Sequence, residues 1–219
     1  MRLYLSSFRL GNNPQRLVDL VRGNMKAAVI VNACDHYCDS ERDARVKQEI
    51  DALGNLGLTA FELDLRRYFG KQEAGASLLS IIDKCGLLWI RGGNTFVLRR
   101  AMSESGFDQL VINFLGRDRL VYGGYSAAAC VLAPSLKGVE LVDDPHVVPI
   151  GYKPPVIWDG LGILPFAIAP HYRSDHPESA DVERQVQYYL DHHCLFIALR
   201  DGEVIVVDGN LEELEKVSN

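Results

Sequence analysis

Several features that would assign a chain to a special class are missing from these 219 residues. No apolar run approaches the roughly 18 residues that cross a bilayer. No apolar segment near the N-terminus leads into a small-residue cleavage site, so the sequence has no signal-peptide pattern. The five cysteines are an odd number and form no C-x-x-C pair, which favours reduced thiols. We therefore expect a cytoplasmic protein that binds no membrane.

A dominant positive charge is missing as well. The chain has 29 acidic and 23 basic residues, a formal net charge of −6, and its lysines and arginines are scattered. Proteins that bind nucleic acid usually carry a basic stripe, so we expect no nucleic-acid partner. Hydrophobic residues make up 47% of the chain, which is typical of a globular protein rather than a disordered one. With no repeat or linker, residues 1–219 are expected to form a single domain.

The sequence does contain short apolar runs that alternate with longer amphipathic stretches. The runs are rich in Val, Ile and Leu, as in strands that are buried on both faces. They are Leu3–Leu5, Ala27–Val31, Ala60–Leu63, Leu87–Ile90, Leu120–Tyr122, Ile163–Ile168, Leu195–Leu199 and Val204–Val207. Helical patterns lie between several of them, at 14–21, 40–53, 94–102, 107–114 and 177–190.

This alternation predicts an α/β fold, a three-layer sandwich in which helices cover both faces of a mostly parallel sheet. The last two apolar runs are separated by a short turn at 200–203, so we expect them to pair as a C-terminal antiparallel hairpin. Functional sites in such sheets form at the C-terminal ends of the strands. The residues that follow the predicted strands are therefore the candidates for chemistry.

Ser126 lies in a segment with the layout of a nucleophile elbow. An apolar run is followed by two glycines, then by Ser126, then by small residues that can begin a helix. Gly124 and Ala128 stand two positions before and after the serine, where a sharp turn demands small side chains. The N–H of Ala127 would then donate to an oxyanion. A glycine turn before a helix that Ser126 caps explains the same segment without any catalysis.

Two further strand ends offer partners for this serine. Gly92 and Gly93 follow a buried strand, where bare backbone lets a ligand approach. The structural alternative is a tight turn with Asn94 as the helix cap. His171 directly follows another predicted strand and is a candidate general base. A loop histidine without function is the alternative for His171.

The carboxylate that would orient His171 is sought in the acidic stretch between the serine and the histidine. Glu140, Asp143 and Asp144 are all available there, and a solvated loop explains at least two of the three. Four histidines cluster at 171, 176, 192 and 193. None of them has the spacing of a known metal motif, so we predict no metal and no cofactor.

Three segments in this order resemble the S51 family of serine peptidases. They are Gly92-Gly93-Asn94-Thr95-Phe96, Gly124-Tyr125-Ser126-Ala127 and Pro170-His171-Tyr172. The opening Leu3-Tyr4-Leu5-Ser6-Ser7 and Gly11-Asn12-Asn13-Pro14 look like the N-terminus of the same family. The family includes dipeptidase E, an α-aspartyl dipeptidase, and cyanophycinases are more distant relatives. The resemblance implies a flavodoxin-like fold similar to class I glutamine amidotransferase domains.

The resemblance also implies roles for individual residues. Ser126 corresponds to the nucleophile and His171 to the general base, while Gly93 and Ala127 correspond to the oxyanion donors. At the family spacing the third residue of the triad is nearest to Glu140. Asp143 and Asp144 are the alternatives, each with a small loop shift. The candidates for substrate binding are Arg91, Asn94, Thr95, Tyr172 and Arg173.

Two positions depart from the family pattern. Ala128 stands where the family has glycine, and Arg91 replaces the first of three glycines. The arginine that binds the acidic side chain in aspartyl dipeptidases falls near Glu183-Arg184 but out of register. Arg91 and Arg173 would lie nearer the cleft and could bind a carboxylate instead.

Together these residues predict a serine hydrolase of small peptides, chiefly dipeptides, including those with N-terminal Asp. Three alternatives stay open. They are a non-catalytic binding module on the same scaffold, a cyanophycinase-like hydrolase, and amidotransferase chemistry, for which Cys130 is the nearest cysteine. A homodimer contact is predicted at the aromatic pair Tyr188-Tyr189.

Overall fold

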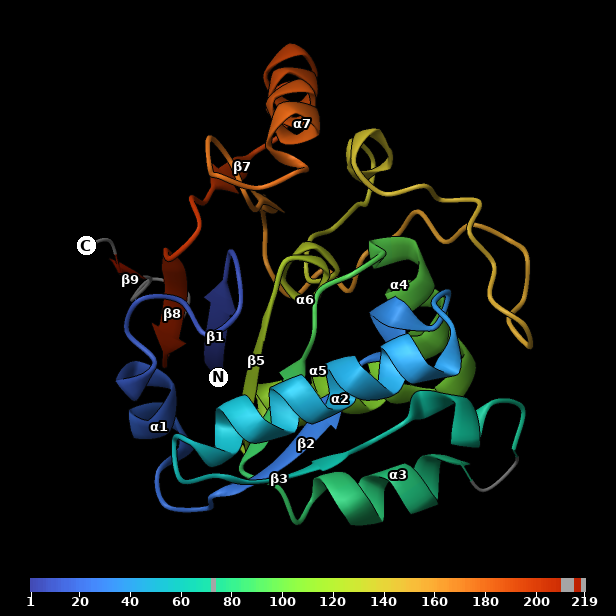
Figure 1. Cartoon of the computed structure of the whole chain (residues 1–219), viewed down its shortest axis with the longest axis vertical. Coiled ribbons are helices and arrows are strands. Elements are labelled where there is room, and N and C mark those ends of the chain that lie inside the picture. The colour runs from blue at the N-terminus through green and yellow to red at the C-terminus, as the bar shows by residue number, and fades with distance from the viewer. Residues whose placement is uncertain (72–73, 210–214, 218–219) are drawn as a thin grey trace.

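The computed structural model describes residues 1–71, 74–209 and 215–217, and its central feature is a seven-stranded sheet (Figure 1). The strand order is β3-β2-β4-β5-β1-β8-β9. These strands are β1 (Arg2–Ser6), β2 (Lys26–Ile30), β3 (Thr59–Glu62), β4 (Leu87–Ile90), β5 (Val121–Tyr125), β8 (Val204–Asp208) and β9 (Glu215–Val217). The five strands from β3 to β1 run parallel, which confirms the predicted mostly parallel sheet.

Helices lie on both sides of this sheet (Figure 1). The longer helices are α1 (Gln15–Val21), α2 (Asp39–Gly54), α3 (Ala74–Ile82), α4 (Thr95–Ser105), α5 (Phe107–Gly116) and α7 (Ser179–Asp191). Short helical turns complete the set: α6 (Ala127–Cys130), η1 (Asn32–Cys34), η2 (Leu65–Tyr68) and η3 (Val139–Leu141). Among the described residues, no helix is long and apolar enough to cross a membrane.

The apolar runs form strands because side chains on both faces of the sheet are buried. Leu88 and Trp89 are neighbours in β4, yet they belong to different core clusters. Successive residues of a strand point to opposite faces, so an uninterrupted apolar run can fill two cores. The cluster around Trp89 includes residues of α1 and α2, and the cluster around Leu88 includes residues of α3, α4 and α5.

The C-terminal part of the chain forms an antiparallel pairing, as predicted, but the run at 195–199 takes no part in it. Its strands are β8 with β1 on one side and β9 on the other. The run at 195–199 instead forms β7 (Phe196–Ala198), which pairs in parallel with β6 (Ala167–Ala169) in a separate small sheet. The free edge of β1 offers β8 five residue pairs, and hydrogen bonding along that edge outweighs a local turn. The run at 163–168 is a strand only from Ala167 onward.

The pair Tyr188-Tyr189 is not the exposed aromatic surface that the sequence suggests. Tyr189 is 1% exposed and packs in the cluster formed by β6 and α7. Its ring lies 5.4 Å from that of Phe196 on β7. Because Tyr189 is buried, it is not available for the predicted dimer contact.

The topology brings several loops to one edge of the main sheet. Because β1, β4 and β5 are parallel, the residues that follow them leave the sheet at the same end. These residues are Ser7 after β1, Gly92 after β4 and Ser126 after β5. The small β6–β7 sheet and α7 lie beyond that end of the sheet (Figure 1).

Candidate active site

Ser126 occupies the sharp turn that the elbow pattern predicts. Its backbone has φ 52° and ψ −112°, a region that an L-residue adopts only under constraint, between the end of β5 and the first residue of α6. A Cβ added to Gly124 would lie 2.3 Å from the carbonyl oxygen of Ile90 and 2.6 Å from Cβ of Ala128. The bare Gly124 therefore makes room for Ala128, which explains how this chain accommodates alanine at the position of the family's glycine.

The two glycines after β4 pass directly beside the serine. A Cβ added to Gly92 would lie 2.9 Å from Cβ of Ser126, and one added to Gly93 would lie 2.7 Å from the carbonyl oxygen of Ala33. In the described part of the chain, no backbone hydrogen bond uses the N–H of Gly93 or of Ala127. Both N–H groups are therefore available to a ligand beside Ser126.

His171 is 2% exposed and is held through both its backbone and its ring. Its N–H donates to Oγ of Ser7 at 2.8 Å, and its Nδ1 lies 2.7 Å from Oδ1 of Asp201. Ser7 also donates to Oδ1 of Asp201 at 2.8 Å. A carboxylate only accepts hydrogen bonds, so the proton of the neutral ring lies on Nδ1 and leaves Nε2 as the basic nitrogen.

The carboxylate that bonds to the ring of His171 belongs to Asp201, which is none of the three predicted acids. The carboxylate of Glu140 accepts from the N–H of Gly138 at 2.6 Å, and that of Asp144 accepts from the N–H of His146 at 2.8 Å. Asp143 accepts from the N–H of Thr95 at 2.8 Å.

The sequence reasoning missed Asp201 because it assigned the turn at 200–203 to a hairpin. The turn joins β7 of the small sheet to β8 of the main sheet. The pairing of β8 with β1 carries Asp201 to the end of β1, beside Ser7. An acidic residue in a turn at a strand end was the available signal.

The environment of Asp201 favours its charged form. Burial opposes ionisation of this carboxyl, but the hydrogen bonds from His171 and Ser7 outweigh it and lower the pKa of Asp201 below its ordinary value. A carboxylate that stays charged beside Nδ1 stabilises a positive charge on His171.

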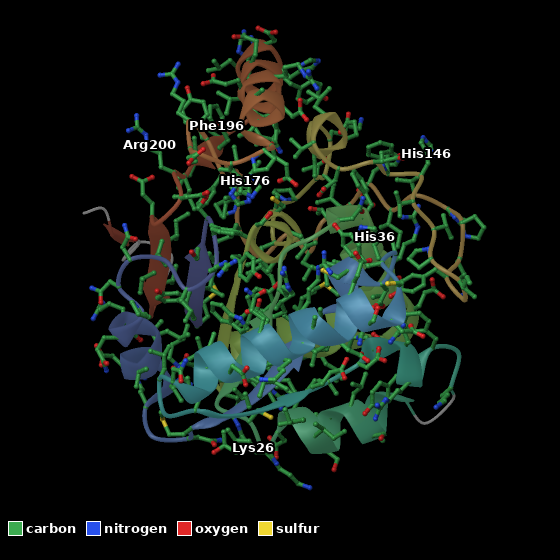
Figure 2. All side chains as sticks on the ribbon, in the orientation of Figure 1. Lys26, His36, His146, His176, Phe196 and Arg200 are labelled. Carbon is green, nitrogen blue, oxygen red and sulfur yellow. The ribbon has the colours of Figure 1, made fainter. Side chains whose placement is uncertain are left out.

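Two aromatic rings hold the plane of His171. The ring of His176 stacks on it with centroids 3.7 Å apart and an interplanar angle of 7°, and Phe8 meets both rings edge-on. His176 is partly buried and lines the same cavity as His171, and in Figure 2 it lies between β7 and α6. Burial and the neighbouring His171 lower the pKa of His176, which favours its neutral form.

Glu178 joins the two histidines in a group that could hold a metal ion. One ligand atom from each of His171, His176 and Glu178 lies within 4.8 Å of the others. Two imidazoles and a carboxylate are a donor set that suits zinc. The sequence prediction that no metal takes part stays a prediction.

A cavity of about 170 Å³ opens beside Ser126 and His171. Arg45 and Arg91 contribute to its lining, together with Tyr37. Nε of Arg91 lies 3.4 Å from Oε1 of Glu49, which partly offsets its charge. The guanidinium of Arg45 stacks 3.9 Å from the ring centroid of Tyr37 and forms no ion pair with a carboxylate in the described residues.

Of the predicted substrate-binding residues, Arg91 and Thr95 line cavities beside Ser126. Asn94 instead caps α4, since its side chain accepts from the N–H of Val97 at 3.0 Å. Arg173 is exposed, forms an ion pair with Glu183 at 2.8 Å and stacks over Tyr172. Neither Tyr172 nor Arg173 lines the cavities beside Ser126. Arg45 was missed because α2 carries none of the motifs that the sequence pointed to.

Comparison with known proteins matches this architecture to a family. A model of peptidase family S51 matches residues 15–214. The chain belongs to peptidase family S51. This S51 peptidase is 27% identical to Peptidase E of Streptomyces coelicolor over 201 residues, which cover 90% of the chain and 75% of that protein. It is 28% identical to a provisionally named alpha-aspartyl dipeptidase of Drosophila melanogaster over 127 residues, 56% of the chain and 50% of that protein.

Solved structures share the fold of this S51 peptidase. A Listeria monocytogenes protein with a provisional peptidase E name superimposes with a TM-score of 0.77 at 22% identity, covering 99% of the chain and 97% of that structure. A peptidase from an acI-B1 actinobacterium superimposes with a TM-score of 0.70 at 15% identity, covering 100% of the chain and 87% of that structure. The α/β architecture predicted from the sequence is confirmed.

Proposed function

We propose that this S51 peptidase hydrolyses small peptides, chiefly dipeptides, through an acyl-enzyme on Ser126. Nε2 of His171 takes the proton of the Ser126 hydroxyl as Oγ attacks the scissile carbonyl carbon, and Asp201 stabilises the resulting imidazolium. The N–H groups of Gly93 and Ala127 donate to the oxyanion. The observation that carries this proposal is the bond from His171 to Asp201, on a histidine that shares one cavity with the constrained Ser126.

The second half of the reaction uses the same groups. His171 gives its proton to the leaving amine, so the peptide bond breaks and the acyl group stays on Ser126. A water molecule then loses a proton to Nε2 of His171 and attacks the acyl carbon. His171 returns this proton to Oγ of Ser126 as the bond between Oγ and the acyl carbon breaks, so the carboxylic acid product leaves and the hydroxyl is restored.

The size and charge of the cavity support a dipeptide. About 170 Å³ gives room for a single leaving residue. Arg45 and Arg91 offer positive charge for a carboxylate, which in a dipeptide is the C-terminal group of the leaving residue. An N-terminal Asp side chain is the second candidate for these arginines, in line with the names of the relatives.

Neither cysteine beside the site suits amidotransferase chemistry. Cys34 lines the cavity, but it is 1% exposed and burial raises the pKa of its thiol. Cys130 is 4% exposed, and burial raises the pKa of its thiol above the ordinary value. A buried neutral thiol is a poor nucleophile.

Replacing the nucleophile tests the proposal. Ser126→Ala should lower kcat/KM for alanyl-alanine by more than about a thousandfold and abolish labelling by a fluorophosphonate. Ser103→Ala, at an exposed position of α4, is the matched control and should keep the wild-type rate. Normal turnover by Ser126→Ala would contradict the serine mechanism.

A panel of dipeptides with acidic, neutral and basic first residues, measured on the wild-type protein, separates the two substrate candidates. A strong preference for N-terminal Asp would assign the arginines to the side chain, and equal rates would assign them to the C-terminus. The cytoplasmic location and the homodimer stay predictions, which fractionation and analytical ultracentrifugation would test.

A further inference from the structure

A second and much smaller hollow lies against Ser126. Its volume is about 10 Å³, and its walls include Val139, Val142 and Val182. A space of this size holds one water-sized group, for which roughly 10–15 Å³ is needed. Because several walls are apolar, the few polar atoms of the lining determine which group can bind in the hollow.

The polar lining of the hollow supplies hydrogen-bond acceptors. Gln185 is 1% exposed; its Nε2 donates to the hydroxyl of Tyr189 at 2.9 Å, while its Oε1 has no partner in the described structure. A buried acceptor without a donor destabilises the folded protein. An occupant that donates to Oε1 would remove this cost.

Two carboxyl groups give the hollow negative charge. Asp143 uses one oxygen, Oδ2, to accept from Thr95, and Glu178 stands where the hollow and the larger cavity meet. The titratable groups that act on Asp143 are Glu178 and His171. No lysine or arginine lines the hollow within the described residues. It is therefore suited to a small cation that carries several N–H donors.

We propose that this hollow binds the α-ammonium of the substrate's N-terminal residue, with Glu178, Asp143 and Oε1 of Gln185 as its partners. This inference rests on the proposed peptidase function. An ammonium group is about the size of a water molecule and has three donors. In a peptide it lies two covalent bonds from the first carbonyl carbon, so it must be close to Ser126 when that carbon is attacked.

The two cavities beside Ser126 would then bind opposite ends of one zwitterion. The acidic hollow takes the ammonium, and the cavity with Arg45 and Arg91 takes the carboxylate of the leaving residue. This polarity sets the direction in which a peptide binds. The enzyme would remove a single residue from a free N-terminus and would leave N-blocked peptides intact.

The first test compares alanyl-alanine with propionyl-alanine, which has a hydrogen in place of the ammonium and adds no bulk. A site built around hydrogen bonds to a substrate group strongly rejects the analogue that lacks it. We expect kcat/KM to fall by about a hundredfold or more for propionyl-alanine. Equal kcat/KM for the two substrates would overturn the inference. If the dipeptide panel shows turnover only of peptides with N-terminal Asp, aspartyl-alanine and succinyl-alanine make the same comparison, and equal kcat/KM for that pair would overturn it.

The second test assigns the preference to the hollow. Glu178→Gln and Gln185→Leu should each reduce the ratio of kcat/KM between alanyl-alanine and propionyl-alanine by about tenfold. Gln187→Leu is the matched control, because Gln187 lies on the same helix, is exposed and bonds only to Asp191 in the described structure. An unchanged ratio in both variants would overturn the inference. If circular dichroism shows that Gln185→Leu does not fold, Glu178→Gln decides.

Fluorophosphonate labelling of Ser126 distinguishes failure of the ammonium site from failure of the proposed peptidase function. If Ser126 is labelled but the ammonium makes no difference, the hollow is assigned wrongly and the peptidase mechanism stands. If Ser126→Ala retains full turnover, the mechanism itself is wrong, and the ammonium site falls with it.

Discussion

At the scale of single residues, the chemistry depends on what each side chain contacts rather than on its type. Asp201 and Glu140 are both carboxylates close to strand or helix ends, yet Asp201 bonds to His171 and Glu140 bonds to a backbone N–H. The first carboxylate can orient a base, and the second stabilises a turn. The same distinction separates Asn94, which caps a helix, from Arg91, which lines the cavity.

Replacing Asp201 tests its role as the positioning residue for His171. Asp201→Asn should lower kcat by about 10³–10⁴-fold, because an amide can hold the ring in the wrong tautomer and cannot stabilise the imidazolium. The pH profile of kcat/KM should shift at the same time, which a purely structural role would not produce. Asp191→Asn, at the exposed end of α7, is the control and should match the wild type.

Asp143 should make stability depend on pH. Burial, offset by hydrogen bonds from Thr95, raises the pKa of Asp143 to about 6 from the model-peptide value of 3.8. Between these two pH values the folded protein binds more protons than the unfolded chain, so this residue stabilises the fold below about pH 4 and loses that effect as pH rises through 6.

Urea denaturation at several pH values measures this effect. The free energy of unfolding of Asp143→Asn minus that of the wild type should increase by about 1–3 kcal/mol between pH 4 and pH 7. Using the difference cancels carboxylates such as Asp201, whose lowered pKa acts in the opposite direction. Asp144→Asn is the exposed neighbouring control. A difference that does not vary with pH would contradict the raised pKa.

At the scale of elements, close contact between strand ends shapes the site. β4 and β5 lie side by side in the sheet, and glycines at their ends let the two chains approach without side chains between them. Ser7 at the end of β1 then links the backbone of His171 to the carboxylate of Asp201. The turn that carries Ser126 is thus held by its neighbours, and its unfavourable backbone angles persist for that reason.

Gly124→Ala should disturb this contact. Its methyl group would meet the carbonyl of Ile90 and the side chain of Ala128 well inside contact distance, which should destabilise the protein by about 1–3 kcal/mol. Gly116→Ala is the matched control, because a Cβ there meets nothing within 4 Å and should be neutral or slightly stabilising. Thermal unfolding compares the two variants. Equal melting temperatures would show that the elbow has more room than the contacts indicate.

At the scale of the whole molecule, the cavity gathers groups from distant parts of the chain. Arg45 comes from α2, Gly93 follows β4, Ser126 follows β5, and His171 follows β6. Arg200, next to Asp201, lies on the outer side of the molecule near β7 (Figure 2). The acidic hollow and the arginine-lined cavity meet beside Ser126, so opposite charges are separated across the site.

Arg45→Ala tests the positive side of this arrangement. It should raise KM for alanyl-alanine by about tenfold, and the effect on alanyl-alanine amide, which lacks the carboxylate, should be much smaller. Arg119→Ala, whose arginine is exposed and pairs with Asp83, is the control. Equal effects on the peptide and its amide would show that Arg45 does not bind the C-terminus.

The sequence by itself determined the class of fold and pointed to Ser126 and His171, which the structure places in the lining of one cavity. Apolar runs that fill two cores specify buried parallel strands, and the steric demands of a sharp turn leave a local signature around Ser126. His171 was predictable because it directly follows a strand. These features depend on short stretches of chain, in which the order of residues already determines which side chains are buried and where a sharp turn can form.

Only the tertiary structure decided which carboxylate bonds to His171, which residues line the cavity and how the last strands pair. Asp201 reaches His171 because β8 adds to the free edge of β1, and competition among sheet edges involves residues that are far apart in the chain. Arg45 and Gln185 meet the site from helices whose sequences carry no motif. Contacts of this kind depend on how the helices and strands pack together, and a local sequence pattern does not predict that packing.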